Sequence, residues 1–181
     1  MNMLQDIRAN RATYDEKPIF RRLLELYAYD FSVYDNLTLN DHGEYGYKYL
    51  DHYWTESDRH PFLLRIHGKP AGFAMVNSHC FIQDAQFAIA EFFVVRLHRR
   101  CGIGTLFAKS VINQFPGTWE VRVMASNEPA EAFWSRLITT HYGVSAHAHS
   151  HPAWQGPIWT FTTLHETPPK DSIDDGTETV R

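Results

Sequence analysis

The chain has 181 residues, of which 44% are hydrophobic and 21% charged, a composition typical of one soluble globular domain. Its 17 Lys and Arg residues against 21 Asp and Glu residues give a formal net charge of −4, which argues against nonspecific nucleic-acid binding. There is no apolar run long enough to span a bilayer, no apolar signal peptide and no disulfide framework around Cys80 and Cys101, so we expect a cytoplasmic protein with free thiols.

The N-terminal part of the chain predicts a helix followed by a loop region. Asp15 and Pro18 favour a helix start, and apolar residues at spacings of three and four extend that helix to about Tyr34. Residues 35–61 contain Asn, Asp and Gly together with several tyrosines, which indicates a loop with a short helix.

Three strands are predicted next. Residues 62–67 and 70–76 are apolar runs on either side of Gly68-Lys69, which indicates a β-hairpin with these two residues in the turn. Residues 86–95 are predicted to form a third, longer strand, which ends in an apolar run.

A basic turn with two glycines follows this third strand. Its sequence is Arg-Arg-Cys-Gly-Ile-Gly at residues 99–104, and an apolar helix begins at Ile103 and stops before Pro116-Gly117. Glycines at such a turn let the backbone approach a ligand, and the first amides of the following helix have no partner within the helix. The pattern therefore indicates an anion-binding turn, although capping alone could explain the glycines.

The C-terminal part predicts another strand, a helix and two closing strands. Residues 119–123 alternate apolar and charged side chains, and Asn127 precedes a helix with apolar residues at positions i, i+3, i+4, i+7 and i+8. Residues 144–150 and 157–163 are predicted closing strands. The tail, residues 167–181, lacks periodicity and is predicted to be disordered.

Residues 62–142 resemble the GNAT superfamily of acetyl-CoA-dependent N-acetyltransferases. The turn at residues 99–104 matches the family's R/Q-x-x-G-x-G/A motif, and residues 127–134, Asn-Glu-Pro-Ala-Glu-Ala-Phe-Trp, match its N-x-x-A-x-x-F-Y motif. The resemblance implies an α/β (α+β) fold over residues 1–166, with a mixed, mostly antiparallel sheet of six to seven strands and helices on both faces. Acetyl-CoA would bind in the opening between the fourth and fifth strands.

The resemblance also assigns roles to residues. The turn amides would bind the CoA pyrophosphate, the end of the splayed strand would bind the pantetheine arm, and the amide near Val95 would face the thioester carbonyl. The residues so implied in cofactor binding are Val94, Val95, Arg96, Arg99, Arg100, Cys101, Gly102, Ile103, Gly104, Thr105, Asn127, Phe133 and Trp134. Tyr27 and Tyr34 are expected to line the acceptor pocket.

Glu91 stands where some members of the family place a catalytic glutamate. An alkylamine with a pKa of about 10 arrives protonated at neutral pH, so it must lose a proton before it attacks. The alternative is that Glu91 is an inward carboxylate bonded by a tyrosine or an amide. The sequence departs from the family at Trp134, because the tyrosine often found there protonates the leaving thiolate; water or another phenol, such as Tyr142, could replace it.

The sequence leaves three function classes. The first is an acetyltransferase that uses acetyl-CoA and an unidentified amine, without nucleic acid or membrane, as a monomer or homodimer. The second is an acyl-CoA-binding sensor without turnover, which Trp134 favours. The third is a metal site at His147, His149 and His151, which share one face of a predicted strand, although exposed edge histidines explain them as well.

Overall fold

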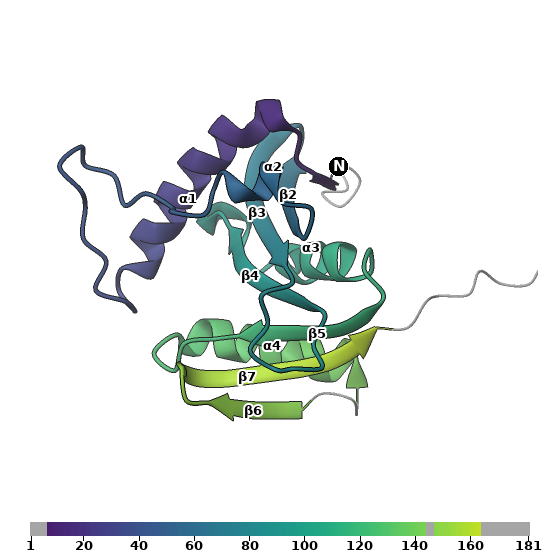
Figure 1. Ribbon diagram of the computed structural model, residues 1–181. Helices are drawn as coiled ribbons and strands as arrows, with labels where there is room; N and C mark the ends of the chain where they lie inside the picture. The colour runs from purple at the N-terminus through teal and green to yellow at the C-terminus, as the bar shows by residue number, and fades with distance from the viewer. Residues whose placement is uncertain (1–6, 144–146, 164–181) are drawn as a thin grey trace, which may run out of the picture.

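The computed structural model describes residues 7–143 and 147–163. Within these residues seven strands form one sheet in the order β1-β2-β3-β4-β5-β7-β6, and every neighbouring pair is antiparallel except β4 with β5 (Figure 1). The predicted mixed, mostly antiparallel sheet with helices on both faces is confirmed. The start of the first predicted closing strand, 144–146, and the tail, 167–181, lie outside the described residues.

No helix among the described residues combines the length and the apolar character that crossing a membrane requires. Cys80 and Cys101 are both free thiols, as predicted.

The N-terminal edge of the sheet holds a strand that the sequence analysis missed. Strand β1 (Ile7–Arg11) pairs antiparallel with β2 (Arg59–Ile66), which continues into β3 (Lys69–Asn77). Only two apolar residues occur in β1, and most of its residues are exposed at the sheet edge. Such a short, polar edge strand has almost no hydrophobic period, so its pairing comes from the backbone rather than from its pattern.

The turn between β2 and β3 lies one residue earlier than predicted. Ile66 pairs with Lys69, so the two turn residues are His67 and Gly68, with φ values of 50° and 74°. Positive φ at both central positions is the geometry of a type I′ turn, which matches the twist of the two strands. The prediction of Gly68-Lys69 as the turn was therefore wrong by one position.

One face of the sheet is covered by the first two helices (Figure 1). Helix α1 (Lys17–Phe31) ends before the predicted Tyr34, a 3₁₀ turn (Tyr14–Glu16) precedes it, and α2 (His52–Thr55) is the predicted short helix. Their buried side chains pack against alternate residues of β2, β3 and β4, namely Leu63, Phe73, Met75 and Phe93.

The opposite face is covered by α3 (Ile103–Ile112) and α4 (Glu128–His141). These helices pack against strand residues whose side chains point away from α1 and α2, including Phe62, Leu64, Ala74, Val76, Trp119 and Val121. Because successive side chains of a strand point to opposite faces, a single apolar strand contributes side chains to the hydrophobic core on each face of the sheet.

The central feature of the sheet is that β4 (Phe87–Val94) and β5 (Gly117–Arg122) separate. They pair only from Phe87 with Trp119 to Ile89 with Val121, whereas β5 stays paired with β7 (Trp154–Thr163) along its whole length. A bulge between β3 and β4, where the register shifts past Met75, adds to the twist of β4. The result is an opening in the sheet between β4 and β5.

A 3₁₀ turn (Arg96–His98) borders this opening and leads from β4 into the predicted basic turn. Strand β6 (His147–His151) pairs with β7 at the other edge of the sheet, away from the opening. Glu120 of β5 anchors the loop between β3 and β4. Its side chain is fully buried and accepts hydrogen bonds from the amides of Phe81 at 2.8 Å and Ile82 at 2.7 Å.

We predict that Glu120→Ala lowers the free energy of unfolding by about 2–4 kcal/mol, because two amides would lose their acceptor in a site that water enters poorly. Urea denaturation of both proteins measures the change. Asp84→Ala removes an exposed carboxylate from the same loop and is the matched control, with an expected change within about 0.5 kcal/mol. Equal stabilities of the two variants would contradict the anchoring role of Glu120.

Candidate functional site

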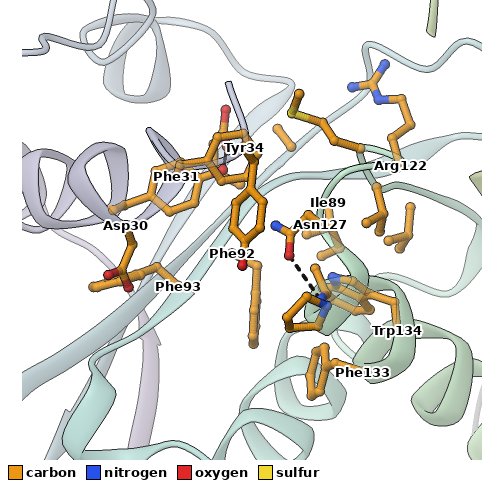
Figure 2. A pocket seen from close by; sticks show the side chains of 18 of the residues that line it. Asp30, Phe31, Tyr34, Ile89, Phe92, Phe93, Arg122, Asn127, Phe133 and Trp134 are labelled. Atoms are coloured by element: carbon orange, nitrogen blue, oxygen red, sulfur yellow. Dashed lines mark hydrogen bonds between the residues drawn. The ribbon is translucent and has the colours of Figure 1, made fainter. Parts of the chain in front are cut away.

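The opening between β4 and β5 leads into a cleft of about 1860 Å³. Its walls come from α1 and the following loop, from β4 and β5, from the basic turn, and from the start of α4. Figure 2 shows Asp30, Phe31 and Tyr34 on one side and Asn127, Phe133 and Trp134 on the other, with Phe92 between them. The cleft therefore joins both faces of the molecule through the separated strands.

The end of β4 turns backbone groups toward this cleft rather than toward a neighbouring strand. The amide of Val95 donates to the carbonyl of Ala71 on β3 at 2.9 Å, so it points away from the opening. Because backbone groups alternate in direction along a strand, those of Phe92 and Val94 point toward the opening. The amide that the sequence places near Val95 is therefore not that of Val95 itself, since the register with β3 turns only those of its neighbours toward the opening.

The basic turn forms a cradle of backbone amides beside the end of β4. Gly102 is the N-cap of α3 with a φ of 83°, a conformation that favours glycine. The amides of Ile103, Gly104 and Thr105 are the first three of the helix and have no carbonyl acceptor within it. A side chain at position 104 would approach Phe133, since a Cβ there would lie 3.3 Å from its Cε2 atom. These amides and the helix dipole make the turn suited to bind an anion.

Two arginines of this region are held by α1. Asp30 accepts hydrogen bonds from Arg96, whose Nε lies 2.9 Å away, and from Arg99. Burial acts to raise the pKa of Asp30, but the hydrogen bonds and charges of Arg99 and Arg96 outweigh it and hold the pKa below its ordinary value. The Nε of Arg99 also donates to the carbonyl of Val94 at 2.6 Å. Arg99 thus lies between the basic turn and the open edge of β4.

An aromatic cluster fills the floor of the cleft. The ring of Phe92 lies 5.3 Å from that of Phe107, 5.7 Å from that of Phe133 and 5.2 Å from that of Trp134. Only 5% of Trp134 is exposed, so this residue is mainly part of the core beneath the cleft.

Asn127 borders the cleft at the start of α4. Its side-chain oxygen accepts from the amide of Ala130 at 3.1 Å, so the carbonyl end caps the helix, as predicted (Figure 2). The NH₂ group of Asn127 is then the end that remains available to a ligand.

Tyr142 is not a candidate proton donor. Its ring stacks on Phe161 with centroids 4.6 Å apart, its hydroxyl donates to Asn113, and it is not among the residues that line the cleft. The last turn of α4 carries it to the opposite end of the helix from Asn127.

Glu91 lies on the α1 side of the opening and accepts two phenolic hydrogen bonds. Tyr27 donates at 2.6 Å and Tyr47 at 3.2 Å, one to each carboxylate oxygen. Burial raises the pKa of Glu91 above its ordinary value, while these hydrogen bonds and the positive charge of Arg122 act to lower it. Burial, together with the charge of Glu91, also raises the pKa of both tyrosines, so they remain protonated donors.

Tyr47 also reaches the site, although the sequence favoured only Tyr27 and Tyr34, because it lies in the irregular segment after α1. That segment returns over the helix because Glu25 accepts hydrogen bonds from the amides of Tyr45 at 2.8 Å and Gly46 at 2.9 Å. The number of tyrosines in this segment was the only signal that it contributes to the site.

The structure brings most of the predicted residues together around the cleft. Those that line it are Glu91, Val94, Arg96, Arg99, Arg100, Gly102, Gly104, Thr105, Asn127, Phe133, Trp134, Tyr27 and Tyr34. The side chains of Val95, Cys101 and Ile103 do not line it. Ile103 is a core residue with 3% exposure, and the Cys101 thiol donates to the carbonyl of His98 at 3.1 Å, so only their backbones can serve the turn.

The three histidines of β6 do not form a group of metal ligands. His149 is bonded to Thr160 at 2.8 Å, and the ring of His151 lies 4.8 Å from that of Phe81. Among the described residues the only convergent group of such ligands is Glu56, Asp58 and His79, and Glu56 is already paired with Arg59.

Comparison with known proteins gives one family. Residues 20–137 match the family model of the acetyltransferase (GNAT) family. No curated protein matches the chain.

Solved structures share the fold at low sequence identity. An acetyltransferase from Thermus thermophilus superposes with a TM-score of 0.69 at 14% identity, over 90% of this chain and 100% of that one. A GNAT family acetyltransferase from Elizabethkingia anophelis with acetyl-CoA bound gives 0.56 at 13% identity, over 88% and 99%. The aminoglycoside acetyltransferase AAC(6')-Ib with coenzyme A and kanamycin gives 0.59 at 11% identity, over 86% and 94%.

The raised pKa of Glu91 predicts a pH-dependent stability difference between the wild type and Glu91→Gln. Between the unfolded pKa, near 4.5, and the higher folded pKa, the folded state binds more protons, so wild-type stability falls as the pH rises through this window. Glutamine removes this loss and can still accept from Tyr27. The Tm difference, variant minus wild type, should therefore be larger at pH 8 than at pH 5.

Thermal unfolding at the two pH values measures this difference. Glu131→Gln, a change on α4 outside the cleft, is the control and should give the same Tm difference at both values. A constant difference for Glu91→Gln as well would show that Glu91 does not titrate abnormally.

Proposed function

Because the chain belongs to the acetyltransferase (GNAT) family, we propose that it transfers the acetyl group of acetyl-CoA to a primary amine by direct attack in a ternary complex. The observation that supports this most strongly is the open edge of β4, which leads directly from the amide cradle of α3 to Glu91. One cleft thus offers an anion site, an extended backbone edge and a candidate base in the order that a thioester carrier and an amine require.

The residues of the cleft fit the donor. The diphosphate would bind the amides of residues 103–105 near Arg99 and Arg100, and the pantetheine arm would bind the open edge at Val94 and the amide group of Asn127. The Elizabethkingia anophelis protein, which shares the fold, has acetyl-CoA bound. Bound acetyl-CoA supplies the activated acetyl group, and the protein supplies position and charge.

The carbonyl oxygen of the thioester gains negative charge when an amine attacks. An amide of β4 that faces the opening, at Phe92 or Val94, would donate to this oxygen without reorganisation. The aromatic cluster beneath Phe92 holds this amide in place and limits access of water.

Glu91 is the proposed general base. The incoming ammonium, with a pKa of about 10, gives a proton to the carboxylate, and its nitrogen then attacks the thioester carbonyl to form the C–N bond. When the tetrahedral intermediate collapses, the C–S bond breaks and the nitrogen gives its second proton to water. Tyr27 and Tyr47 fix the carboxylate and remain protonated, so the base is Glu91 rather than a phenolate. The leaving thiolate, with a thiol pKa of about 8.5, can take its proton from water at neutral pH, so Trp134 does not prevent turnover.

We predict that Glu91→Gln lowers kcat/KM by roughly 10²- to 10⁴-fold, the usual contribution of a general base, with CoA affinity within about twofold of the wild type. Thiol release over an amine panel measures the rate, and calorimetric titration measures CoA binding. The wild-type rate should also fall as the pH drops through the raised pKa of Glu91, because the base is then protonated. Glu131→Gln is the control and should retain the wild-type rate.

The alternative is an acyl-CoA-binding module without turnover, which the position of Trp134 favours. CoA binding without thiol release for any amine would support the module. Thiol release at the wild-type rate in Glu91→Gln would instead show that the protein is an enzyme in which Glu91 is not the general base. A chain that binds no CoA would contradict both.

A further inference from the structure

A second charged group lies on the acceptor side of the opening. Trp119, Val121 and Val123 of β5 and its extension face the core under α3 and α4, so Arg122 projects to the opposite face. Glu91 is on that same face, because it contacts Tyr27 of α1. The two residues follow the last β4–β5 pair, Ile89 with Val121, so both stand where the strands separate.

The guanidinium of Arg122 is held in position by aromatic rings. It lies 4.3 Å from the ring centre of Phe81 and 5.7 Å from that of Trp154. Only 16% of the side chain is exposed, and it lines the cleft across from Phe31 and Tyr34 (Figure 2). A guanidinium held over aromatic rings in this way can still donate its N–H groups to a planar or tetrahedral anion.

Among the described residues Arg122 has one ion-pair partner, and the rest of its guanidinium is not engaged in hydrogen bonds. Its Nη1 atom lies 3.4 Å from the carbonyl of His79 and 3.4 Å from Oε1 of Glu120, both long contacts. The other carboxylate oxygen of Glu120 is used by the amides of the loop above it. Within the part of the chain that the structure describes, Nε and Nη2 of Arg122 have no protein acceptor, so two donors are available to a ligand.

The carboxylates around the cleft do not suit a polycation. Asp30, Asp35 and Glu91 line it, and Asp30 is already paired with Arg96 and Arg99. Two carboxylates therefore remain, and one of them is bonded by two tyrosines. An aminoglycoside, which carries several ammonium groups, would meet Arg122 with little opposing charge.

We propose that the acceptor is an amine that also carries an anionic group, a carboxylate or a phosphate, with the amine at Glu91 and the anion at Arg122. This inference rests on the proposed acetyl transfer and adds the substrate class. Arg122 would orient the acceptor by paired hydrogen bonds in a partly buried site, where charge-assisted bonds are strongest. Its loss should therefore act on recognition of the anion.

The experiment compares matched acceptors in the thiol-release assay. The carboxylate arm contains ω-amino acids from β-alanine to 6-aminohexanoate, the phosphate arm contains the corresponding aminoalkyl phosphates, and unsubstituted alkylamines of equal length are the reference. Kanamycin is the polycationic probe. We expect one anionic arm to exceed the reference at least tenfold in kcat/KM, and the better arm identifies the anion.

Variants then test the assignment to Arg122. Arg122→Gln should reduce the ratio of kcat/KM for anionic over neutral acceptors toward one, and Arg122→Lys, which keeps the charge but not the paired donors, should give an intermediate ratio. Arg21→Gln removes an exposed arginine that pairs with Glu44 outside the cleft, and it should leave the ratio unchanged. Folding of each variant is checked by its Tm.

A direct binding measurement separates the two proposals. Calorimetric titration of the amino acids and aminoalkyl phosphates into the CoA-saturated protein needs no turnover, and binding should weaken at least tenfold in Arg122→Gln. A preference for neutral amines or kanamycin, with normal thiol release, would overturn the inference and leave the acetyl transfer intact. Anion-dependent binding without thiol release for any amine would support the Arg122 site and overturn the acetyl transfer. If neither anion-dependent binding nor thiol release is observed, the Arg122 site and the acetyl transfer are both overturned.

Discussion

The separation of β4 from β5 is the constraint on which the other features depend. The two strands pair for only three positions, and β5 is held by β7 while a bulge turns β4 away. Backbone groups left unpaired in this way are costly unless a partner satisfies them, and here Arg99 occupies the carbonyl of Val94. The opening is therefore maintained by packing on both sides, with Phe92 and Trp134 on one side of the sheet and α1 on the other.

The α1 face of the molecule connects the two halves of the cleft. One helix carries Tyr27, which fixes Glu91, and Asp30, which fixes Arg96 and Arg99, so a shift of α1 would alter both the candidate base and the anion site. The loop after α1 adds Tyr47 through its attachment to Glu25. On the opposite wall, Glu120 fixes the loop that stacks Phe81 on Arg122. Glu25 and Glu120 thus each fix a loop of the cleft by accepting hydrogen bonds from two backbone amides.

Local patterns predicted the fold well where one element carries its own signal. The helix after Asn127 follows from its apolar spacing, and the turn at the start of α3 follows from glycines placed before a helix. Contacts between distant segments could not be predicted in this way. The direction of the Val95 amide depends on the strand register, Tyr47 reaches Glu91 through an irregular loop, and Arg122 borders the cleft only because β5 separates from β4. Strand β1 was missed because an edge strand needs little hydrophobic pattern.

Residue-resolved amide hydrogen exchange with and without CoA tests the central claim most directly. If the separated strand and the start of α3 bind the donor, the amides of Phe92, Val94 and residues 103–105 that face the cleft should gain protection when CoA is added. The amide of Val95, which is already bonded to Ala71, serves as an internal reference and should not change. Protection that is confined to other regions, or the same exchange with and without CoA, would contradict the account.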